Sequence, residues 1–307
     1  MEKSNVSIFE TSQEERSTKF KTYLETYVPN FNEMEYHEQV KELKRMKKGF
    51  ENNMKAIGKR YGFDSKKLIT PLDNGMSHKP GDYFVASENL YEKEENLKKL
   101  KTPGNIVILK RDNPGIAVGY SVSDDPVVIM EDQEKGITAL AHCGIKQITQ
   151  RIPLYMIKAM QKEVGSNIKN IKVYISSNLK KENNKVIFRP KEIKNNPEVW
   201  KGQVKRSHKL EPSRGTIEKV INITRFLTEK SINQEGAITK MLIQRGINPE
   251  SITINKKNTY TNPNLFSKTK AKDLHEKELE GSYLVGAYYE DTFPEYKAEP
   301  RRTRKLR

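Results

Sequence analysis

The sequence predicts an α+β fold in which helices and short strands alternate around one layered core. From residue 105 onward, short β-rich runs are separated by turn residues, and after residue 150 helical spacing alternates with further strands. The chain of 307 residues is long enough for a sizeable buried core. Because only 35% of the residues are hydrophobic and 31% are charged, we expect polar helices and loops around that core.

The N-terminal part of the chain is predicted to be mainly helical. Between Glu35 and Tyr61, apolar residues recur every three or four positions among Lys and Glu, which is typical of one long amphipathic helix with Gly49 as a candidate break. Residues 70–80 are rich in turn-formers and are predicted to be a loop. Residues 91–101 form a charged run that predicts another helix, closed by Pro103 and Gly104.

The rest of the chain supplies the alternating elements of the predicted core. Strands are expected at residues 106–109, 116–122, 127–130, 137–140, 171–176, 186–189, 252–254 and 283–288. Helical spacing is found at residues 152–164, 217–227 and 238–243, and Gly246 is expected to end the last of these helices. The strand at 186–189 lies in a Lys- and Asn-rich stretch that otherwise predicts a long loop.

Charge and cysteine content limit the classes of partner and compartment. The 56 Lys and Arg against 40 Asp and Glu give a net charge of +16, which favours anionic partners such as nucleic acid, anionic lipid or phosphorylated small molecules. The last seven residues are strongly basic and are either a solvated tail or a segment that grips phosphate. The single Cys143 excludes an internal disulfide and fits a reducing compartment. Without an apolar signal region or a run of about 18 apolar residues, the chain is predicted to be cytoplasmic, with no membrane span.

Two motifs follow one another in the predicted sheet. The first runs from Ser121 through Asp124, Asp125 and Pro126 to Met130, and the second runs from Gly136 to His142-Cys143-Gly144. They resemble the laccase-domain or polyphenol oxidoreductase family, the YfiH-like proteins, in which Thr-Ala-Asp-Cys-x-Pro-Val precedes Ala-His-Ala-Gly-Trp-Arg-Gly. The direct matches are Pro126-Val127 and Ala141-His142-x-Gly144. Further on, Asn258-Thr259-Tyr260-Thr261 and Phe266-Ser267 resemble two later motifs of the family in the same order.

This resemblance implies a layered α/β/β/α core of mixed β-sheets over residues 51–290. Residues 1–50 are then an N-terminal helical extension, and residues 291–307 are a basic C-terminal tail. It also implies a metal-dependent purine nucleoside phosphorylase or adenosine deaminase, whose substrates are a purine nucleoside and phosphate. In the family, two histidines and a cysteine bind a metal, chiefly zinc, with copper as the alternative.

The implied metal site is altered in this chain. By position, His142 is the second histidine, Asp124 replaces the cysteine, and Asn74 replaces the first histidine, with His78 as a substitute ligand. Zinc prefers thiolate and imidazole, and an amide is a weak ligand. Lys146 follows His142 where the family has arginine, and lysine binds phosphate only as a point charge. We expect Asp124 and His142 to lie close together at neighbouring strand ends, with the loop of residues 72–78 near them.

Two hypotheses follow from the matches and the substitutions. The first is an enzyme in which Asp124, His142 and Lys146 are catalytic and turnover of the nucleoside is reduced or lost. The second is a non-catalytic protein that uses its basic surface to bind nucleic acid or a protein partner. Each site residue also has an ordinary structural interpretation: His142 as a hydrogen-bonded histidine at a sheet edge, Cys143 as a small buried side chain, and Asp124-Asp125 as part of a turn.

Overall fold

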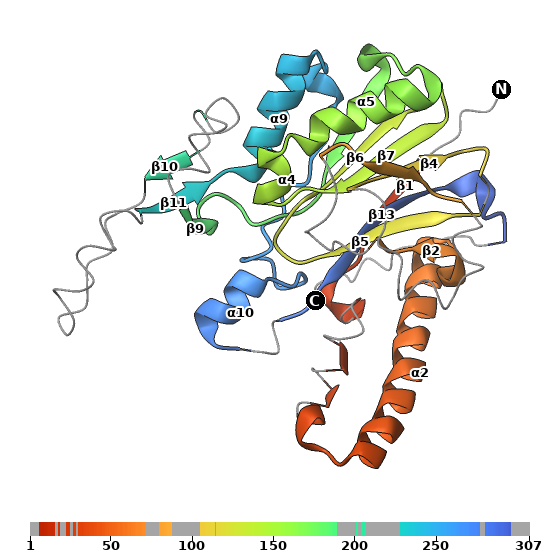
Figure 1. Ribbon diagram of the computed structural model, residues 1–307, viewed down its shortest axis with the longest axis vertical. Helices are drawn as coiled ribbons and strands as arrows, with labels where there is room; N and C mark the ends of the chain where they lie inside the picture. Colours follow the sequence, from red (N-terminus) through yellow and green to blue (C-terminus); the bar gives the residue numbers. More distant parts are fainter. Residues whose placement is uncertain are drawn as a thin grey trace, which may run out of the picture.

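A computed structural model describes residues 6–15, 18, 23–24, 27–28, 30–71, 80–87, 105–113, 115–188, 201, 204–206, 228–276 and 280–295 of the chain. Two mixed β-sheets lie face to face, and helices cover their outer faces (Figure 1). The predicted α+β class and the α/β/β/α layering are both confirmed. Most of the expected loop at 70–80, the helices expected at 91–101 and 217–227, and the basic tail beyond residue 295 lie outside the described residues.

The larger sheet has six strands in the order β12-β8-β6-β7-β4-β3. Their bounds are Ile252–Ile254 for β12, Ile171–Ile175 for β8, Val127–Asp132 for β6, Ile137–His142 for β7, Ile106–Lys110 for β4 and Tyr83–Val85 for β3. The two outermost pairs, β12 with β8 and β3 with β4, are parallel, and the other pairs are antiparallel. The predicted strands at 106–109, 127–130, 137–140, 171–176 and 252–254 are therefore confirmed.

Both faces of the central strands β4, β6 and β7 are buried, which explains why these strands are mainly apolar runs. In β6, Val128 and Met130 pack in the cluster formed with the helices, whereas Val127 and Ile129 pack against the second sheet. The helices on the first face are α4 (Ile145–Thr149), α5 (Ile152–Val164) and α9 (Gln234–Arg245). Helix α5 has the predicted bounds, and Gly246 ends α9 in the left-handed conformation, as expected.

The second sheet has four strands in the order β1-β13-β5-β2. Its bounds are Val6–Glu10 for β1, Tyr283–Tyr289 for β13, Ala117–Val122 for β5 and Leu68–Ile69 for β2. Its inner face meets the six-stranded sheet, and its outer face packs against Ile57 and Phe63 at the end of helix α2 (Tyr36–Tyr61). The smaller elements are β9 (Lys185–Phe188), β10 (Val204–Arg206) and β11 (Thr228–Ile232) in a third sheet, helix α10 (Lys268–Leu274), and the 3-10 turns η1 (Gln13–Glu15), η2 (Phe31–Glu33), η3 (Ser65–Lys67), η5 (Ile168–Asn170), η6 (Pro249–Ser251) and η8 (Glu290–Thr292).

The N-terminal region differs from the helical extension expected for residues 1–50. Residues 6–10 form strand β1, which pairs with β13 in the second sheet, because the short run from Val6 to Phe9 finds its partner near the other end of the chain. Helix α2 is confirmed and continues through Gly49, whose missing side chain admits Tyr23: an added Cβ there would lie 3.0 Å from the Tyr23 hydroxyl oxygen. None of the helices in the described ranges combines the length and the apolar character needed to cross a membrane.

Candidate functional site

One edge of the six-stranded sheet collects polar residues from four strands. Antiparallel β6 and β7 pair Val127 with His142, so the beginning of β6 lies beside the end of β7. The ends of β8 and β12 reach the same edge, because Ile175 pairs with both Val128 and Ile254. The residues just before β6 and just after β7, β8 and β12 therefore gather at this edge, together with the first turn of α9.

His142 and Asp125 form a close pair at this edge. The His142 Nε2 atom lies 3.3 Å from Asp125 Oδ2, and the His142 side chain is 18% exposed. Gln234, the first residue of α9 and 2% exposed, donates from Nε2 to Asp125 Oδ1 over 2.8 Å. Gly144 permits this packing, since an added Cβ would lie 2.7 Å from Asp125 Oδ2. A carboxylate held in this way orients an imidazole and stabilises the imidazolium that forms when the ring accepts a proton.

Asp124 has a different environment from its neighbour. Its Oδ1 atom accepts a hydrogen bond from Thr259 Oγ1 at 2.9 Å, and its Oδ2 atom accepts from both the backbone N–H and the hydroxyl of Thr269, each at 2.8 Å. Thr269 lies in the first turn of α10, where a carboxylate satisfies an otherwise unpaired N–H group. The Asp124 carboxylate therefore joins the β5–β6 turn to α10.

The metal site implied by the resemblance is not assembled from the described residues. Both oxygens of Asp124 already accept hydrogen bonds, and His142 has the Asp125 carboxylate beside its Nε2 atom. In the part of the chain that the structure describes, no group of three His, Cys, Asp or Glu side chains is placed to hold a metal ion. Asn74 and His78, the other expected ligands, lie outside that part. The described residues thus do not fit a three-ligand zinc or copper ion.

The other sequence-derived candidates are placed as follows. Lys146 is exposed in the first turn of α4, two residues after Gly144, so its charge lies next to the edge that holds His142. Cys143 is fully buried in the core cluster on the helical face, as its ordinary interpretation expected. The sequence motifs included Asp125 but gave it no role beyond a turn, and they did not include Gln234. The pairing of Asp125 was detectable only as one of two adjacent acids before a strand, and Gln234 carried no sequence signal.

A second polar network lies beside the pair. The Lys180 ammonium forms an ion pair with Glu235 and donates to the Asn255 carbonyl oxygen at 2.9 Å, and Asn178 Nδ2 donates to Glu235 over 3.2 Å. Two buried acceptor atoms next to these contacts, Gln234 Oε1 and Asn178 Oδ1, have no hydrogen-bond partner among the described residues. Unpaired buried acceptors are rare in folded proteins, so these two atoms distinguish this edge from the rest of the core.

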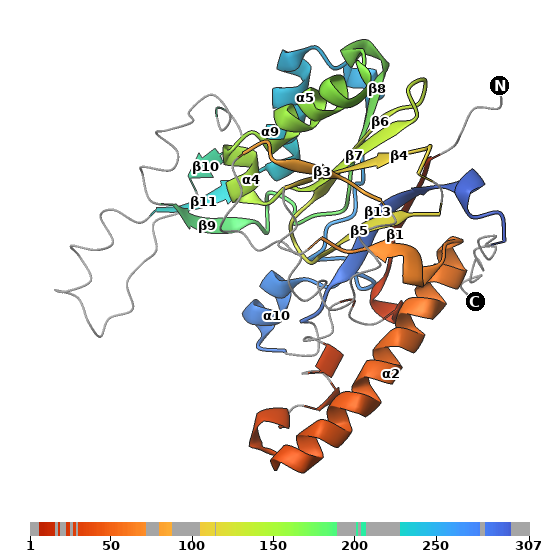
Figure 2. The same ribbon diagram turned by 45° about the vertical axis from the view of Figure 1, so that its right-hand side comes forward.

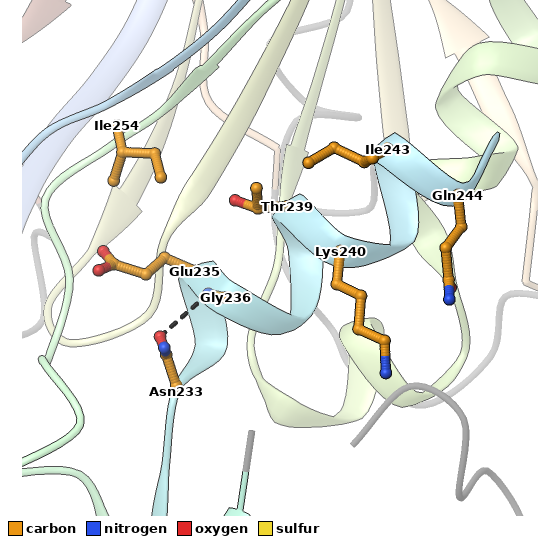
Figure 3. Close-up of a pocket in the computed structure, with 8 residues that line it drawn as sticks. All are labelled: Asn233, Glu235, Gly236, Thr239, Lys240, Ile243, Gln244 and Ile254. Atoms are coloured by element: carbon orange, nitrogen blue, oxygen red, sulfur yellow. Dashed lines mark hydrogen bonds between the residues drawn. The ribbon is translucent and has the colours of Figure 1, made fainter. Parts of the chain in front are cut away.

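An open hollow of about 470 Å³ lies along α9 next to this network. Figure 3 shows the side chains of Glu235, Thr239 and Ile243 directed toward Ile254, while Lys240 and Gln244 point away from it. Asn233 caps the helix by accepting from the Gly236 N–H at 2.9 Å. Neither Asp125 nor His142 lines this hollow, so the acid–base pair and the hollow are distinct features of the same edge.

Glu10, the last residue of β1, joins this strand to the C-terminal ends of β8 and β12. Its carboxylate accepts hydrogen bonds from the Tyr174 hydroxyl at 2.8 Å, the Ser177 hydroxyl at 2.6 Å and Asn255 Nδ2 at 3.0 Å. Burial, followed by the nearby Glu10 charge, raises the pKa of Tyr283 well above its usual value, and its neutral hydroxyl donates to the Ser177 carbonyl oxygen at 2.9 Å. These bonds fix the loop after β8, which carries Asn178 and Lys180.

The chain is similar to known proteins both in sequence motifs and in fold. The family model described as multi-copper polyphenol oxidoreductase laccase matches residues 108–275, a range that includes Asp125, His142 and Gln234. No curated protein matches the chain.

Solved structures with this arrangement of sheets and helices have little sequence identity to the chain. The hypothetical protein YfiH of Bacillus licheniformis is 14% identical with a TM-score of 0.58, and YlmD of Geobacillus stearothermophilus is 13% identical with a TM-score of 0.58. In both comparisons the match covers 78% of this chain and 80% of the other. A Neisseria meningitidis protein is 10% identical with a TM-score of 0.51, over 78% of this chain and 81% of the other. The fold is thus shared across most of each chain.

Proposed function

The chain belongs to the multi-copper polyphenol oxidoreductase laccase family, and we propose that it binds a purine nucleoside at the Asp125–His142 edge and cleaves it slowly with phosphate. The substrate class comes from the resemblance of the motifs around Pro126 and His142 to the YfiH-like proteins. The observation that carries the proposal is the 3.3 Å contact between His142 Nε2 and Asp125 Oδ2 within the matched range.

The proposed reaction uses His142 as the acid and base. A phosphate oxygen forms a bond to C1′ of the ribose as the bond between C1′ and the purine nitrogen breaks. The departing purine takes the bonding electron pair and a proton from His142, and the proton released by the new phosphate ester returns to His142. Asp125 stabilises the imidazolium, and Gln234 holds Asp125 in place. Lys146 supplies positive charge for the phosphate.

Weak turnover is expected because the residues at the positions of the family's metal ligands have changed. In the family type, a metal polarises substrate or activates water. Asp124 takes the place of a thiolate ligand, but its carboxylate is bonded to Thr259 and Thr269. If each missing group removes about 2 to 4 kcal/mol of transition-state stabilisation, several together lower the rate by many orders of magnitude. The residual reaction then depends on the acid–base pair.

The test is phosphate-dependent release of base from adenosine and inosine, together with elemental analysis of the same preparation. We expect slow turnover that requires phosphate and is lost in His142→Ala, with metal far below one ion per chain. Equal turnover in wild type and His142→Ala would assign the activity to a contaminant and overturn the proposal. Release of ammonia from adenosine without phosphate would show that the reaction is deamination and not phosphorolysis. Stoichiometric zinc that is essential for turnover would instead require a ligand from outside the described residues, with His78 and Asn74 as the first candidates.

A further inference from the structure

Helix α2 extends away from the two sheets. Its lower part projects beyond the sheets and the other helices in both views (Figures 1 and 2). One face of α2 packs against other parts of the protein. Met46 packs in a small cluster with Tyr23, Leu24 and Val28, and Ile57 packs against the second sheet. Of the 26 residues of α2, only Met46, Ile57 and Gly58 are buried. The opposite face is open to solvent.

The open face of α2 carries one sign of charge. At about 100° per residue, six exposed cations fall within a sector of about 100°, opposite the face that holds Met46 and Ile57. We call this set the basic stripe: Lys41, Lys44, Arg45, Lys48, Lys55 and Lys59. The acidic residues of the helix, Glu38, Glu42 and Glu51, lie outside the sector. The stripe runs about 27 Å along the helix axis at 1.5 Å per residue.

An ordinary solvated helix face would mix the two signs. Opposite charges spaced by three or four residues stabilise a helix by about 0.2 to 0.5 kcal/mol per pair, and like charges destabilise it by a similar amount. Within the basic stripe the three- and four-residue spacings join like charges, as in Lys44 with Lys48 and Lys55 with Lys59. Arg45 forms an ion pair with Glu42 at 2.6 Å. Glu38 and Glu51 also lie three or four residues from Lys41, Lys48 and Lys55 and offset part of the repulsion. The repulsion that remains along the stripe would be relieved by a polyanion.

We propose that the basic stripe of α2 binds the phosphate backbone of double-stranded nucleic acid. The stripe lies on one uninterrupted helix, and its length matches about eight base pairs at 3.4 Å per phosphate along one strand. It contains no aromatic side chain, so it lacks the stacking surface with which single-strand binders hold bases. A membrane is the less suitable partner, because the apolar face of α2 packs on Tyr23, Leu24 and the second sheet. Binding is expected to be independent of base sequence.

The experiment measures binding of the full-length chain to a labelled 20-base-pair DNA duplex by fluorescence anisotropy over a range of salt concentrations. The test variant is Lys44→Gln/Lys48→Gln/Lys55→Gln, because glutamine keeps the helix propensity of lysine. The matched control is Lys135→Gln/Lys169→Gln/Arg245→Gln, which removes the same charge from exposed positions elsewhere. A third variant with arginine at positions 44, 48 and 55 keeps the charge. Circular dichroism checks that α2 is intact.

We expect the test variant to bind at least about tenfold more weakly at low salt, with a salt slope reduced by about 3, since each phosphate contact contributes about 0.9 to the slope. The control and the arginine variant should bind like the wild type. Equal loss in the test variant and the control would assign binding to net charge and overturn the proposal. It would also be overturned if the wild type did not bind duplex at low salt, or bound single strands or anionic vesicles more tightly than duplex.

Discussion

The Asp125 carboxylate and the His142 imidazole meet at 3.3 Å because Asp125 lies just before β6 and His142 is the last residue of β7, its antiparallel neighbour. The backbone holds this arrangement, since the Cys143 N–H donates to the Pro126 carbonyl oxygen at 2.8 Å. Residues that are separated in sequence thus become a pair whose geometry the sheet register fixes. The adjacent Asp124 instead accepts hydrogen bonds from Thr259 and from Thr269 of α10.

Replacing Asp125 by Asn should reduce the proposed nucleoside cleavage. The substitution keeps the size of the side chain but removes the charge that stabilises the protonated imidazole of His142. We expect kcat to fall by about 10²-fold or more, because without the Asp125 charge His142 is less able to carry the proton that the departing purine takes. KM should change little, because Asp125 contacts His142 and Gln234 and has no proposed contact with the substrate. The measurement is steady-state phosphorolysis of adenosine. Asp112→Asn, at an exposed position, is the control and should leave kcat unchanged. Equal kcat in Asp125→Asn and wild type would remove Asp125 from the mechanism.

The elements predicted best from the sequence are the strands that are buried on both faces and the helix with regularly spaced apolar residues. Strands β4, β6 and β7 are buried on both faces, so their apolar runs were visible without knowledge of their partners. Helix α5 was equally clear from its spacing. Strands β1 and β2 were missed because both are only partly buried and pair with segments far away in the chain, and β2 has only two residues.

The candidate site was predictable only in part, for a similar reason. The motifs indicated His142 and the acids before β6. Which of the two acids faces the histidine depends on the turn between β5 and β6, and sequence spacing does not specify that turn. The contribution of Gln234 depends on how the N-terminus of α9 packs at the sheet edge, so it became visible only in three dimensions.

Stability should depend on pH through the contact between Glu163 and its two partners. Hydrogen bonds from Lys110 and then Tyr83 lower the pKa of Glu163 below its usual 4.5. Burial, followed by the bond to Glu163, raises the pKa of Tyr83 to about 12. A lowered carboxyl pKa contributes stability that is fully present above pH 4.5 and is lost as pH falls through the folded-state value. The Tyr83 contribution is present below pH 10 and is lost as pH rises toward 12.

Urea unfolding of wild type and Glu163→Gln at several pH values measures this effect. We expect the wild type to be more stable at pH 7 and the difference to shrink as the pH falls below 4.5. Glu250→Gln, an exposed position, should follow the wild type throughout. A difference between wild type and Glu163→Gln that is constant from pH 7 to pH 3 would contradict the assignment to ionised Glu163.

Gly286→Ala should strongly destabilise the second sheet. Gly286 faces Gly119 across β13 and β5, and an added Cβ would lie 2.1 Å from the Val118 carbonyl oxygen and 2.5 Å from Phe9 Cζ. Neither the central strand nor the packed ring can move away easily, so we expect a loss of about 3 kcal/mol in the free energy of unfolding. Urea denaturation gives the value. Gly165→Ala has open space around it but a φ of +68°, and should lose only about 1 kcal/mol. Similar losses of unfolding free energy in both variants would show that the neighbours of Gly286 move to accommodate the added Cβ, which would contradict the prediction.

Asp124→Ala distinguishes a structural role for Asp124 from a role as a metal ligand. The change removes three hydrogen bonds and leaves the Thr269 N–H at the start of α10 and the buried Thr259 hydroxyl without this acceptor. We expect the free energy of unfolding to fall by about 2 to 3 kcal/mol. In a double-mutant cycle with Thr269→Ala, the coupling energy should be about 1 kcal/mol. Urea unfolding supplies both numbers.

Thermal unfolding with and without added zinc completes this test of Asp124. A ligand that binds only the folded state raises Tm with its concentration. If the Asp124 carboxylate anchors α10, zinc should raise the Tm of the wild type and of Asp124→Ala by the same small amount, and the metal content of the two proteins should be equal. If Asp124 is a ligand, zinc should stabilise the wild type and not the variant, and the coupling with Thr269 should vanish once zinc is bound. Asp124→Asn keeps one acceptor oxygen and should lie between wild type and Asp124→Ala in stability, which ties the loss to the acceptors of this side chain.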